Sequence, residues 1–334
     1  MIRLRDEMLS LAGLGRPRIA IVRAGALGDT ILLLPALGLV RRALSHVDIT
    51  LVGSTWAEKL APLLGQPWKF IPFDSQLTAP LFGADASDDP TGAFHRSDLV
   101  INYTSARTSA FARNIRRLCR GAVIEWPVAP APGMHAACHF AAAVSAGVPA
   151  VEELPLPSLR VGPDARERPA LWIAQHFKDA RGQLAVVHPG SGSERKCWPA
   201  PMFAQLASGL AGLGMRVALL KGPADEQCCS AVAAGLRNGE DVAVAEADDI
   251  QHAAALVSCA AVFVGNDSGM SHLAAALGTP SVAIFGPTDP SVWRPLGRSV
   301  AVVQGAQKER ERAAWPPLEA VLNAVRAQAG ITAS

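Results

Sequence analysis

Short β-type runs alternate with longer helical patterns along most of the chain, and this alternation limits the possible folds more than any other feature. Seven runs are apolar, partly β-branched and bounded by glycine, proline or aspartate: 18–23, 48–52, 98–103, 183–188, 215–220, 261–264 and 281–285. Because these runs are apolar on both faces, they favour parallel strands covered by helices on both sides. Helix-compatible spacing occurs at residues 30–44, 199–213, 270–277 and 316–327. The pattern predicts an α/β fold.

The chain of 334 residues is too long for one ordinary hydrophobic core, so we expect two domains. A connection is expected at residues 152–169, which hold four prolines and separate two β-α series. We therefore predict two Rossmann-like domains facing a central cleft, at 1–160 and 161–315, followed by a helix and tail at 316–334. Ligands of such sheets bind beyond the carboxyl ends of the strands.

Composition and charge exclude several classes of protein. Half of the residues are apolar and the net charge is +2, so nucleic acid is not an expected partner. The six cysteines form no zinc-type spacing, so we expect reduced thiols and no metal site. Residues 1–14 lack the apolar core of a signal peptide, and the apolar run 31–40 is too short to cross a bilayer. We expect a cytoplasmic location, with peripheral contact at the inner membrane left open.

A glycine-bearing loop follows each of three predicted strands. The first, residues 23–29, has two glycines but neither a dinucleotide fingerprint nor a Walker P-loop. It ends in Asp29, which either accepts a proton from an acceptor hydroxyl or caps the helix that follows. The second, residues 188–199, runs from a Gly/Ser stretch to Lys196 and then to a helix at Pro199. A helix N-terminus and a lysine suit a diphosphate, and a solvated surface loop is the alternative.

The third loop spans residues 265–272 and opens another helix. Backbone N–H groups near Ser268 and Gly269 are expected to face a phosphate, and Asp267 to accept sugar hydroxyls. His272, on the first turn, is expected to touch phosphate or ribose. Helix capping by Asp267 or Ser268 and a buried His272 are the alternatives. A further turn at 285–290 is explained equally well by Gly-Pro and Asp-Pro turn chemistry.

These motifs together resemble glycosyltransferase family 9, the heptosyltransferases of the lipopolysaccharide inner core. The resemblance is carried by residues 23–29 with 35–37, by 188–190 with 196–199, and by 265–272, 277–280 and 285–288. It extends over about residues 18–295. The first loop carries Ala24-Gly25 where the family often has hydroxyl residues, and the middle loop 192–194 has no secure match to its phosphate-contacting threonines.

The resemblance implies the two-domain GT-B fold and inverting transfer from a nucleotide sugar, usually ADP-heptose, without a required metal or other cofactor. It assigns Asp29 as the catalytic base and Lys196 as the residue that neutralises the diphosphate. It places the nucleotide sugar against a further set of residues: Gly28, Ser191, Lys196, Asp267, Ser268, Gly269 and His272.

An arginine-rich stretch at 105–121 contains no acidic residue. Guanidinium groups suit carboxylates and phosphates, so an anionic glycolipid acceptor is the expected partner, and a solvated helix face is the alternative. The candidates are Arg107, Arg113, Arg116, Arg117 and Arg120.

Other functions remain open at this point. One is a family member that uses another nucleotide sugar, or a protein or different glycan as acceptor. Another is a non-catalytic nucleotide-sugar-binding scaffold, which predicts that Asp29→Ala leaves function unchanged. A dehydrogenase is disfavoured by the missing dinucleotide fingerprint.

Overall fold

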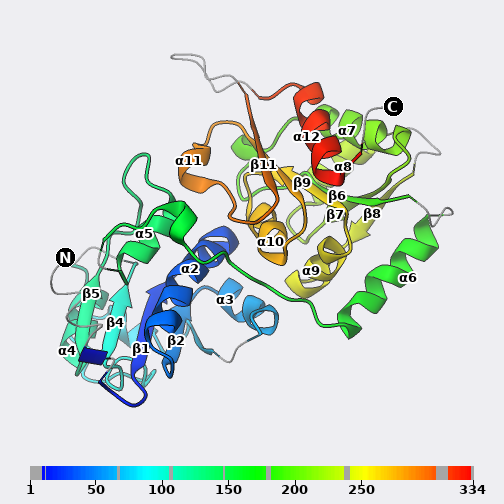
Figure 1. Ribbon diagram of the computed structural model, residues 1–334. Coiled ribbons are helices and arrows are strands. Elements are labelled where there is room, and N and C mark those ends of the chain that lie inside the picture. Colours follow the sequence, from blue (N-terminus) through cyan, green and yellow to red (C-terminus); the bar gives the residue numbers. More distant parts are fainter. Residues whose placement is uncertain are drawn as a thin grey trace. The chain divides into compact units, whose positions relative to one another are not determined.

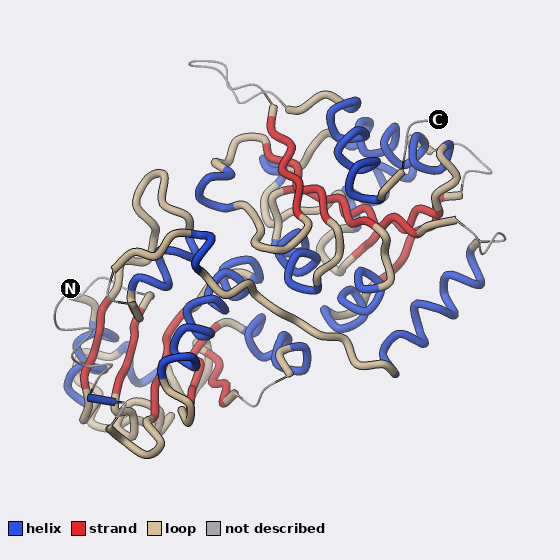
Figure 2. The backbone as a smooth tube through the Cα atoms, in the orientation of Figure 1, coloured by secondary structure: helices blue, strands red, loops and turns tan. Residues whose placement is uncertain are grey.

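The computed structural model describes residues 10–11, 13–65, 68–104, 108–145, 147–177, 182–236, 241–305 and 315–331. The chain divides into two compact units, Met1–Pro155 and Leu156–Ser334 (Figure 1). Each unit holds one parallel sheet, as Figure 2 shows in red. The predicted α/β fold is thereby confirmed.

The first unit contains a five-stranded sheet in the order β3-β2-β1-β4-β5. Its strands are β1 (Arg18–Arg23), β2 (Asp48–Gly53), β3 (Lys69–Pro72), β4 (Leu99–Asn102) and β5 (Ala122–Glu125). Its helices are α2 (Leu27–Ala43), α3 (Thr55–Leu60), α4 (Ala110–Leu118) and α5 (Ala136–Ala142).

The second unit contains a six-stranded sheet in the order β11-β10-β9-β6-β7-β8. Its strands are β6 (Leu184–His188), β7 (Arg216–Lys221), β8 (Val242–Glu246), β9 (Val262–Asn266), β10 (Ser281–Phe285) and β11 (Val300–Gln304). Its helices are α6 (Glu167–His176), α7 (Ala200–Gly212), α8 (Glu226–Ala233), α9 (Ile250–Ser258), α10 (Gly269–Leu277), α11 (Pro290–Trp293) and α12 (Leu318–Ala329).

Helices cover both faces of the second sheet, because the side chains of its central strands alternate between two apolar clusters. Val187 of β6 and Val264 of β9 pack with residues of α7, α8 and α12. Val186 and Phe263, one position earlier, pack on the other face with residues of α9 and α10. A strand buried on both faces needs the continuous apolar sequence that these segments have.

Both sheets reverse their strand order at one point, between β1 and β4 in the first unit and between β6 and β9 in the second. The loops that leave neighbouring strands on either side of such a point diverge and open a crevice, which is where α/β sheets bind ligands. The first and third predicted loops follow β1 and β9, and the middle loop follows β6. The topology therefore favours the same loops as the sequence does.

Two boundaries differ from the sequence prediction. Helix α2 begins at Leu27 rather than at residue 30, so that Asp29 lies inside its first turn. The last residues of the predicted connection 152–169 belong to a helix, because α6 begins at Glu167. Pro169 is accommodated there because N–H groups in a first helical turn have no partner within the helix.

No helix among the described residues is long and apolar enough to cross a membrane. The six cysteines carry free thiols.

Candidate functional site

The centre of the second unit's site is an ion pair between Lys196 and Asp267. The ammonium of Lys196 lies 2.8 Å from Oδ2 of Asp267, and Thr288 donates its hydroxyl to the same oxygen at 2.7 Å. These residues follow β6, β9 and β10 respectively. Lys196 and Asp267 were both predicted from the sequence, and the structure brings them together. Thr288 was not predicted as a site residue, because Gly-Pro and Asp-Pro turn chemistry explained its turn equally well.

The Asp267 side chain is only 6% exposed, whereas that of Lys196 is 35% exposed. A buried carboxylate without a positive partner is costly, and the ammonium of Lys196 offsets the burial of Asp267. Oδ1 of Asp267 accepts no hydrogen bond from the described residues, and this leaves an oxygen for a ligand hydroxyl.

Lys196 is positioned by the residues that follow it. Trp198 is 1% exposed and packs edge-to-face on Phe203, with ring centroids 5.2 Å apart. Its indole N–H donates to the carbonyl of Pro316 at 3.1 Å. Burying a large aromatic side chain anchors the short segment that carries Lys196.

Asn266 connects the loops after β6 and β9. This fully buried side chain accepts the backbone N–H of Trp198 at 2.9 Å and donates to the carbonyl of Pro189 at 2.8 Å. Ser191 completes the connection, because its hydroxyl donates to the backbone carbonyl of Asp267 at 3.0 Å. Asn266 was not predicted from the sequence, since nothing in the pattern distinguishes a bridging amide from any residue that ends a strand.

We expect Asn266→Ala to lower the free energy of unfolding by about 3 kcal/mol, because buried polar groups on both loops lose their partners. Urea unfolding measures this loss. Asn323→Ala, on α12 in the same unit, is the control and is expected to change little. Equal stability of the Asn266 variant and the wild type would show that the bridge does not hold the loops.

The remaining predicted residues of this unit lie at the start of α10. Ser268 is the N-cap and Gly269 the first helical residue. The Ser268 hydroxyl is buried and has no hydrogen-bond partner among the described residues, so this helix N-terminus has a spare hydroxyl beside its free N–H groups. His272 lies in the first turn and is 4% exposed, so it packs inside the unit. Its contact with a phosphate or ribose stays a prediction.

A second polar pair supports the loop after β6. His188 donates from Nε2 to Oδ2 of Asp225 at 3.0 Å, and the same oxygen accepts the backbone N–H of Gly222 at 2.9 Å. A Cβ at Gly190 would lie 1.9 Å from Oδ1 of Asp225, so only glycine allows this approach. Asp225 was not identified from the sequence, because its partner lies 37 residues away.

The pKa of Asp225 is lowered from its ordinary value of 3.8. Burial raises it, but the hydrogen bond and the charge of His188 and the bond from Gly222 outweigh burial. A lowered folded-state pKa gives stability that is present above the ordinary value and is lost as the pH falls through the lowered one.

Asp225→Asn is therefore expected to lower the free energy of unfolding by about 1–3 kcal/mol near neutral pH. The difference from the wild type should shrink as the pH falls below 3.8 and then through the lowered pKa of the wild-type carboxyl. Urea unfolding midpoints across this range test the effect, with the exposed Asp241→Asn as control. A difference that does not depend on pH would contradict it.

In the first unit, Asp29 pairs with Arg23. Nη2 of Arg23 lies 2.6 Å from Oδ1 of Asp29, and the backbone N–H of Ala26 donates to Oδ2 at 3.1 Å. The N-cap of α2 is Ala26, and Asp29 is the third residue of the helix. Asp29 is therefore not the N-cap residue that the alternative predicted. Its carboxylate nevertheless accepts a free backbone N–H at the start of the helix. Gly28 lies beside it in the same turn.

Arg23 is 9% exposed, and its guanidinium lies 5.1 Å from the centre of the Phe140 ring. Tyr103, after β4, donates its hydroxyl to the carbonyl of Phe140 at 2.7 Å. The Asp29 side chain, by contrast, is 21% exposed. A fixed cation thus stabilises an accessible carboxylate.

The structure describes four of the five arginines predicted for the acceptor. Arg107 lies outside the described residues. Arg113 donates to the carbonyl of Thr108, Arg116 pairs with Glu125 at 3.0 Å, and Arg117 donates to the carbonyl of Ala86. Arg120 lies just before β5, at the opposite end of the sheet from Asp29. Acceptor binding by these residues stays a prediction.

Residues 139–316 match the model of glycosyltransferase family 9 (heptosyltransferase), and this match covers more than half of the chain. The chain belongs to glycosyltransferase family 9. Lipopolysaccharide heptosyltransferase 1 of Escherichia coli is 26% identical to it over 312 residues, covering 87% of this chain and 94% of that relative.

Lipopolysaccharide heptosyltransferase 3 of Escherichia coli is 32% identical to this family 9 chain over 137 residues. That match covers 40% of this chain and 38% of the relative, so the chain spans about two fifths of its length.

Solved structures of the family share the fold. A family 9 glycosyltransferase from Veillonella parvula superposes with a TM-score of 0.78 at 19% identity, covering 95% of this chain and 98% of that one. ADP-heptose lipopolysaccharide heptosyltransferase II of E. coli superposes with a TM-score of 0.73 at 18% identity, with 93% and 98% covered. This likeness agrees with the predicted GT-B architecture of two parallel-sheet units.

Proposed function

We propose that the chain is an inverting glycosyltransferase that moves a heptose from ADP-heptose to a hydroxyl of a lipopolysaccharide inner-core acceptor. The observation that carries the proposal is the Lys196–Asp267 pair at the switch point of the second sheet, beside the N-terminus of α10. Family membership supports it, as do relatives described as heptosyltransferases. One structural neighbour is an E. coli heptosyltransferase solved with ADP.

The charged and polar groups at the site of the second unit match those of a nucleotide sugar. The Lys196 ammonium and the N–H groups at the start of α10 attract the diphosphate and stabilise it as it departs. Asp267, through Oδ1, accepts sugar hydroxyls and orients the anomeric carbon. A carboxylate next to a diphosphate would repel it, and Lys196 neutralises Asp267 on the other oxygen.

Asp29 is the proposed base. Each of its oxygens accepts one hydrogen bond, so each keeps a lone pair for the acceptor hydroxyl. The proton moves to Asp29 while the hydroxyl oxygen attacks the anomeric carbon, and the bond from that carbon to the diphosphate breaks. We propose that this transfer needs no metal, because Lys196 supplies the charge, and that it occurs in the cytoplasm with peripheral contact at the membrane.

Calorimetric titration with ADP-heptose, ADP and UDP-glucose tests the nucleotide-sugar assignment. ADP-heptose is expected to bind the wild type, to bind it equally after dialysis against EDTA, and to lose most affinity for Asp267→Ala. Asp164→Asn, an exposed aspartate of the same unit, is the control and should bind normally. Tighter binding of UDP-glucose would retain sugar transfer and discard heptose, and binding of none of the three would overturn the proposal.

A further inference from the structure

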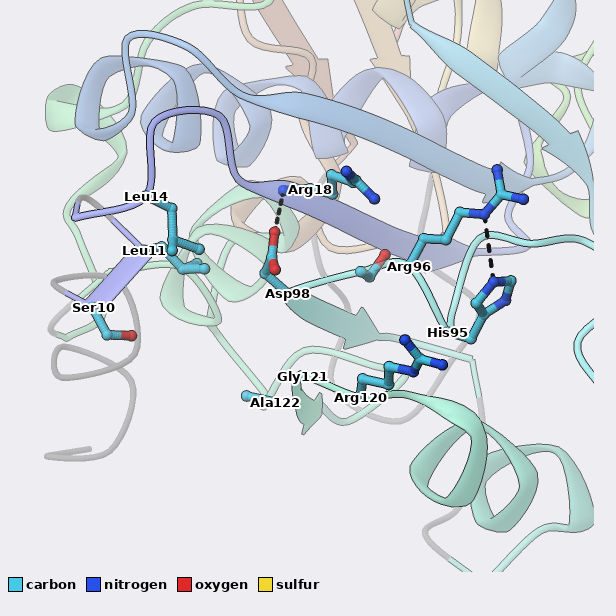
Figure 3. Close-up of a pocket in the computed structure, with 11 residues that line it drawn as sticks. Ser10, Leu11, Leu14, Arg18, His95, Arg96, Asp98, Arg120, Gly121 and Ala122 are labelled. Atoms are coloured by element: carbon cyan, nitrogen blue, oxygen red, sulfur yellow. Dashed lines mark hydrogen bonds between the residues drawn. The ribbon is translucent and has the colours of Figure 1, made fainter.

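A pocket of about 780 Å³ lies in the first unit, at the amino ends of its strands. Arg18 begins β1, Asp98 directly precedes β4, and Arg120 and Gly121 directly precede β5 (Figure 3). Asp29 follows the other end of β1. A six-residue strand spans roughly 17–20 Å at about 3.3 Å per residue, so the pocket is separate from the candidate catalytic carboxylate.

The pocket is strongly cationic. Arg18, Arg96 and Arg120 line it together with His95, and Asp98 is the only acidic residue among the described residues that line it. Oδ2 of Asp98 accepts the backbone N–H of Arg18 at 2.7 Å. None of the three guanidinium groups forms an ion pair within the described part of the chain. Neighbouring Arg16, in contrast, pairs with Asp48 at 2.8 Å.

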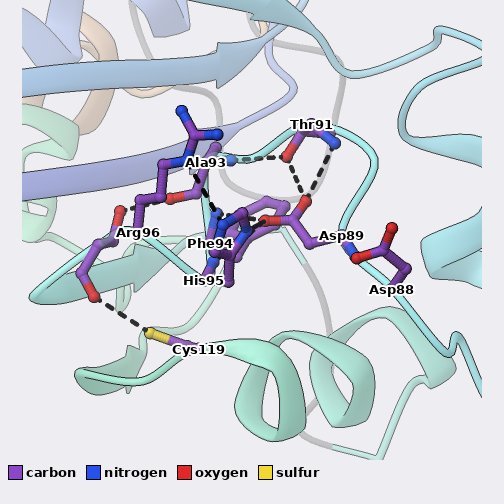
Figure 4. Close-up of polar contacts among 9 residues, drawn as sticks. Asp88, Asp89, Thr91, Ala93, Phe94, His95, Arg96 and Cys119 are labelled. Carbon is purple, nitrogen blue, oxygen red and sulfur yellow. Dashed lines mark hydrogen bonds and ion pairs between the residues drawn. The ribbon is translucent and has the colours of Figure 1, made fainter.

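One wall of the pocket is held by a buried carboxylate, Asp89, whose side chain is 1% exposed. Asp89 accepts the backbone N–H of Phe94 at 2.7 Å and that of His95 at 3.1 Å, and the His95 ring nitrogen Nδ1 lies 3.4 Å away (Figure 4). The other ring nitrogen of His95, Nε2, accepts a hydrogen bond from the Nε–H group of Arg96 at 3.4 Å. The loop that carries Arg96 is thus fixed from inside the unit, which lowers the entropy lost when a ligand binds.

The other wall depends on Gly121. A Cβ at this position would lie 2.1 Å from the backbone oxygen of Asp98, so only glycine permits the close approach. The backbone N–H of Ala122 donates to that same oxygen at 3.0 Å. This contact places Arg120 beside the start of β4, on the same pocket as Arg96.

We propose that this pocket binds a phosphate-bearing ligand. Planar guanidinium groups match phosphate oxygens, and several of them without carboxylate partners suit a group that carries more than one negative charge. The volume is in the range of ligand pockets and exceeds what one phosphate fills. Leu11 and Leu14 line the pocket too and offer apolar contact to the part of the ligand next to its phosphate. The proposal does not depend on sugar transfer.

Pyrophosphate is the probe, and the Lys196→Ala protein is the starting point, because it lacks the lysine proposed to bind diphosphate in the second unit. Calorimetry at low salt is expected to show one saturable site in this protein. Adding Arg96→Gln and Arg120→Gln should weaken binding at least tenfold. The control adds Arg42→Gln and Arg160→Gln, which remove two exposed charges elsewhere and should leave the affinity unchanged.

If pyrophosphate binding weakens equally in both double variants, the effect comes from net charge alone and the proposal is overturned. Unchanged binding in both would overturn it too. If Lys196→Ala binds pyrophosphate as the wild type does while the pocket variant loses binding, the result supports the pocket as the binding site. The same result would contradict diphosphate binding by Lys196.

A second measurement identifies the source of the phosphate. Sedimentation is compared between phosphatidylcholine vesicles with and without phosphatidic acid. Phosphatidic-acid binding that is lost in the pocket variant supports a lipid-borne phosphate. If the pocket variant still sediments with phosphatidic-acid vesicles but has lost pyrophosphate binding, the ligand is a soluble phosphate compound.

Discussion

Asp29→Asn is expected to slow sugar transfer by about 10²–10⁴-fold, the usual contribution of a general base. Asparagine has nearly the same shape, but its one carbonyl oxygen can accept only one of the hydrogen bonds that Arg23 and Ala26 donate to the two carboxylate oxygens, and it cannot accept a proton from the acceptor. Affinity for the nucleotide sugar should not change, because the residues proposed to bind it lie mainly in the second unit. Single-turnover rates and calorimetry on the same protein separate the two effects.

Asp74→Asn, at an exposed position of the first unit, is the control and should react at the wild-type rate. If Asp29→Asn keeps the wild-type rate and Asp267→Ala still loses binding, another group is the base. The non-catalytic scaffold, in contrast, predicts no transfer by any of these proteins.

Lys196→Met is expected to lower kcat by about 10²–10³-fold, as loss of one charged group that stabilises a leaving group does. It also leaves the Asp267 carboxylate, 6% exposed, without its cation. Binding of the diphosphate should weaken too, because a buried negative charge would then face it. Steady-state kinetics report the first effect and ADP titration the second.

Lys221→Met is the matched control, since Lys221 belongs to the same unit and pairs with Glu226 and Glu246 at the surface. Those carboxylates raise the pKa of Lys221 through hydrogen bonds. Exposed ion pairs contribute little to stability, so the control should keep its activity. A Lys196 variant as active as this control would remove Lys196 from the reaction.

The strands that the sequence predicted and those that it missed differ in their place in the sheets. The seven predicted runs correspond to β1, β2, β4, β6, β7, β9 and β10, which all have a strand on each side. The four missed strands, β3, β5, β8 and β11, form the sheet edges. An edge strand has one strand neighbour and is less buried, and β3 and β5 accordingly have only short apolar runs. The edge strands β8 and β11 do carry apolar runs, VAVA and VAVV, which the sequence prediction overlooked.

The site shows a similar division. The loops were predictable, because glycine and charged residues follow apolar runs at the carboxyl ends of strands. The partners were not: Thr288 meets Asp267 from 21 residues away, and Asn266 reaches Pro189 from 77 residues away. Such contacts depend on strand order, which the local pattern of residues does not contain.

Strand order also determines when the second unit can assemble during synthesis. Its central strand β6 ends at His188, but its neighbour β9 begins only at Val262. The edge of β6 that pairs with β9 therefore lacks its strand neighbour while β7 and β8 emerge, and the indole of Trp198 gains its carbonyl partner only with Pro316. Contacts of such large sequence separation form slowly and leave partly folded chains prone to aggregation. The segment that carries Lys196 is consequently synthesised early but reaches its final contacts only after Pro316 has been added.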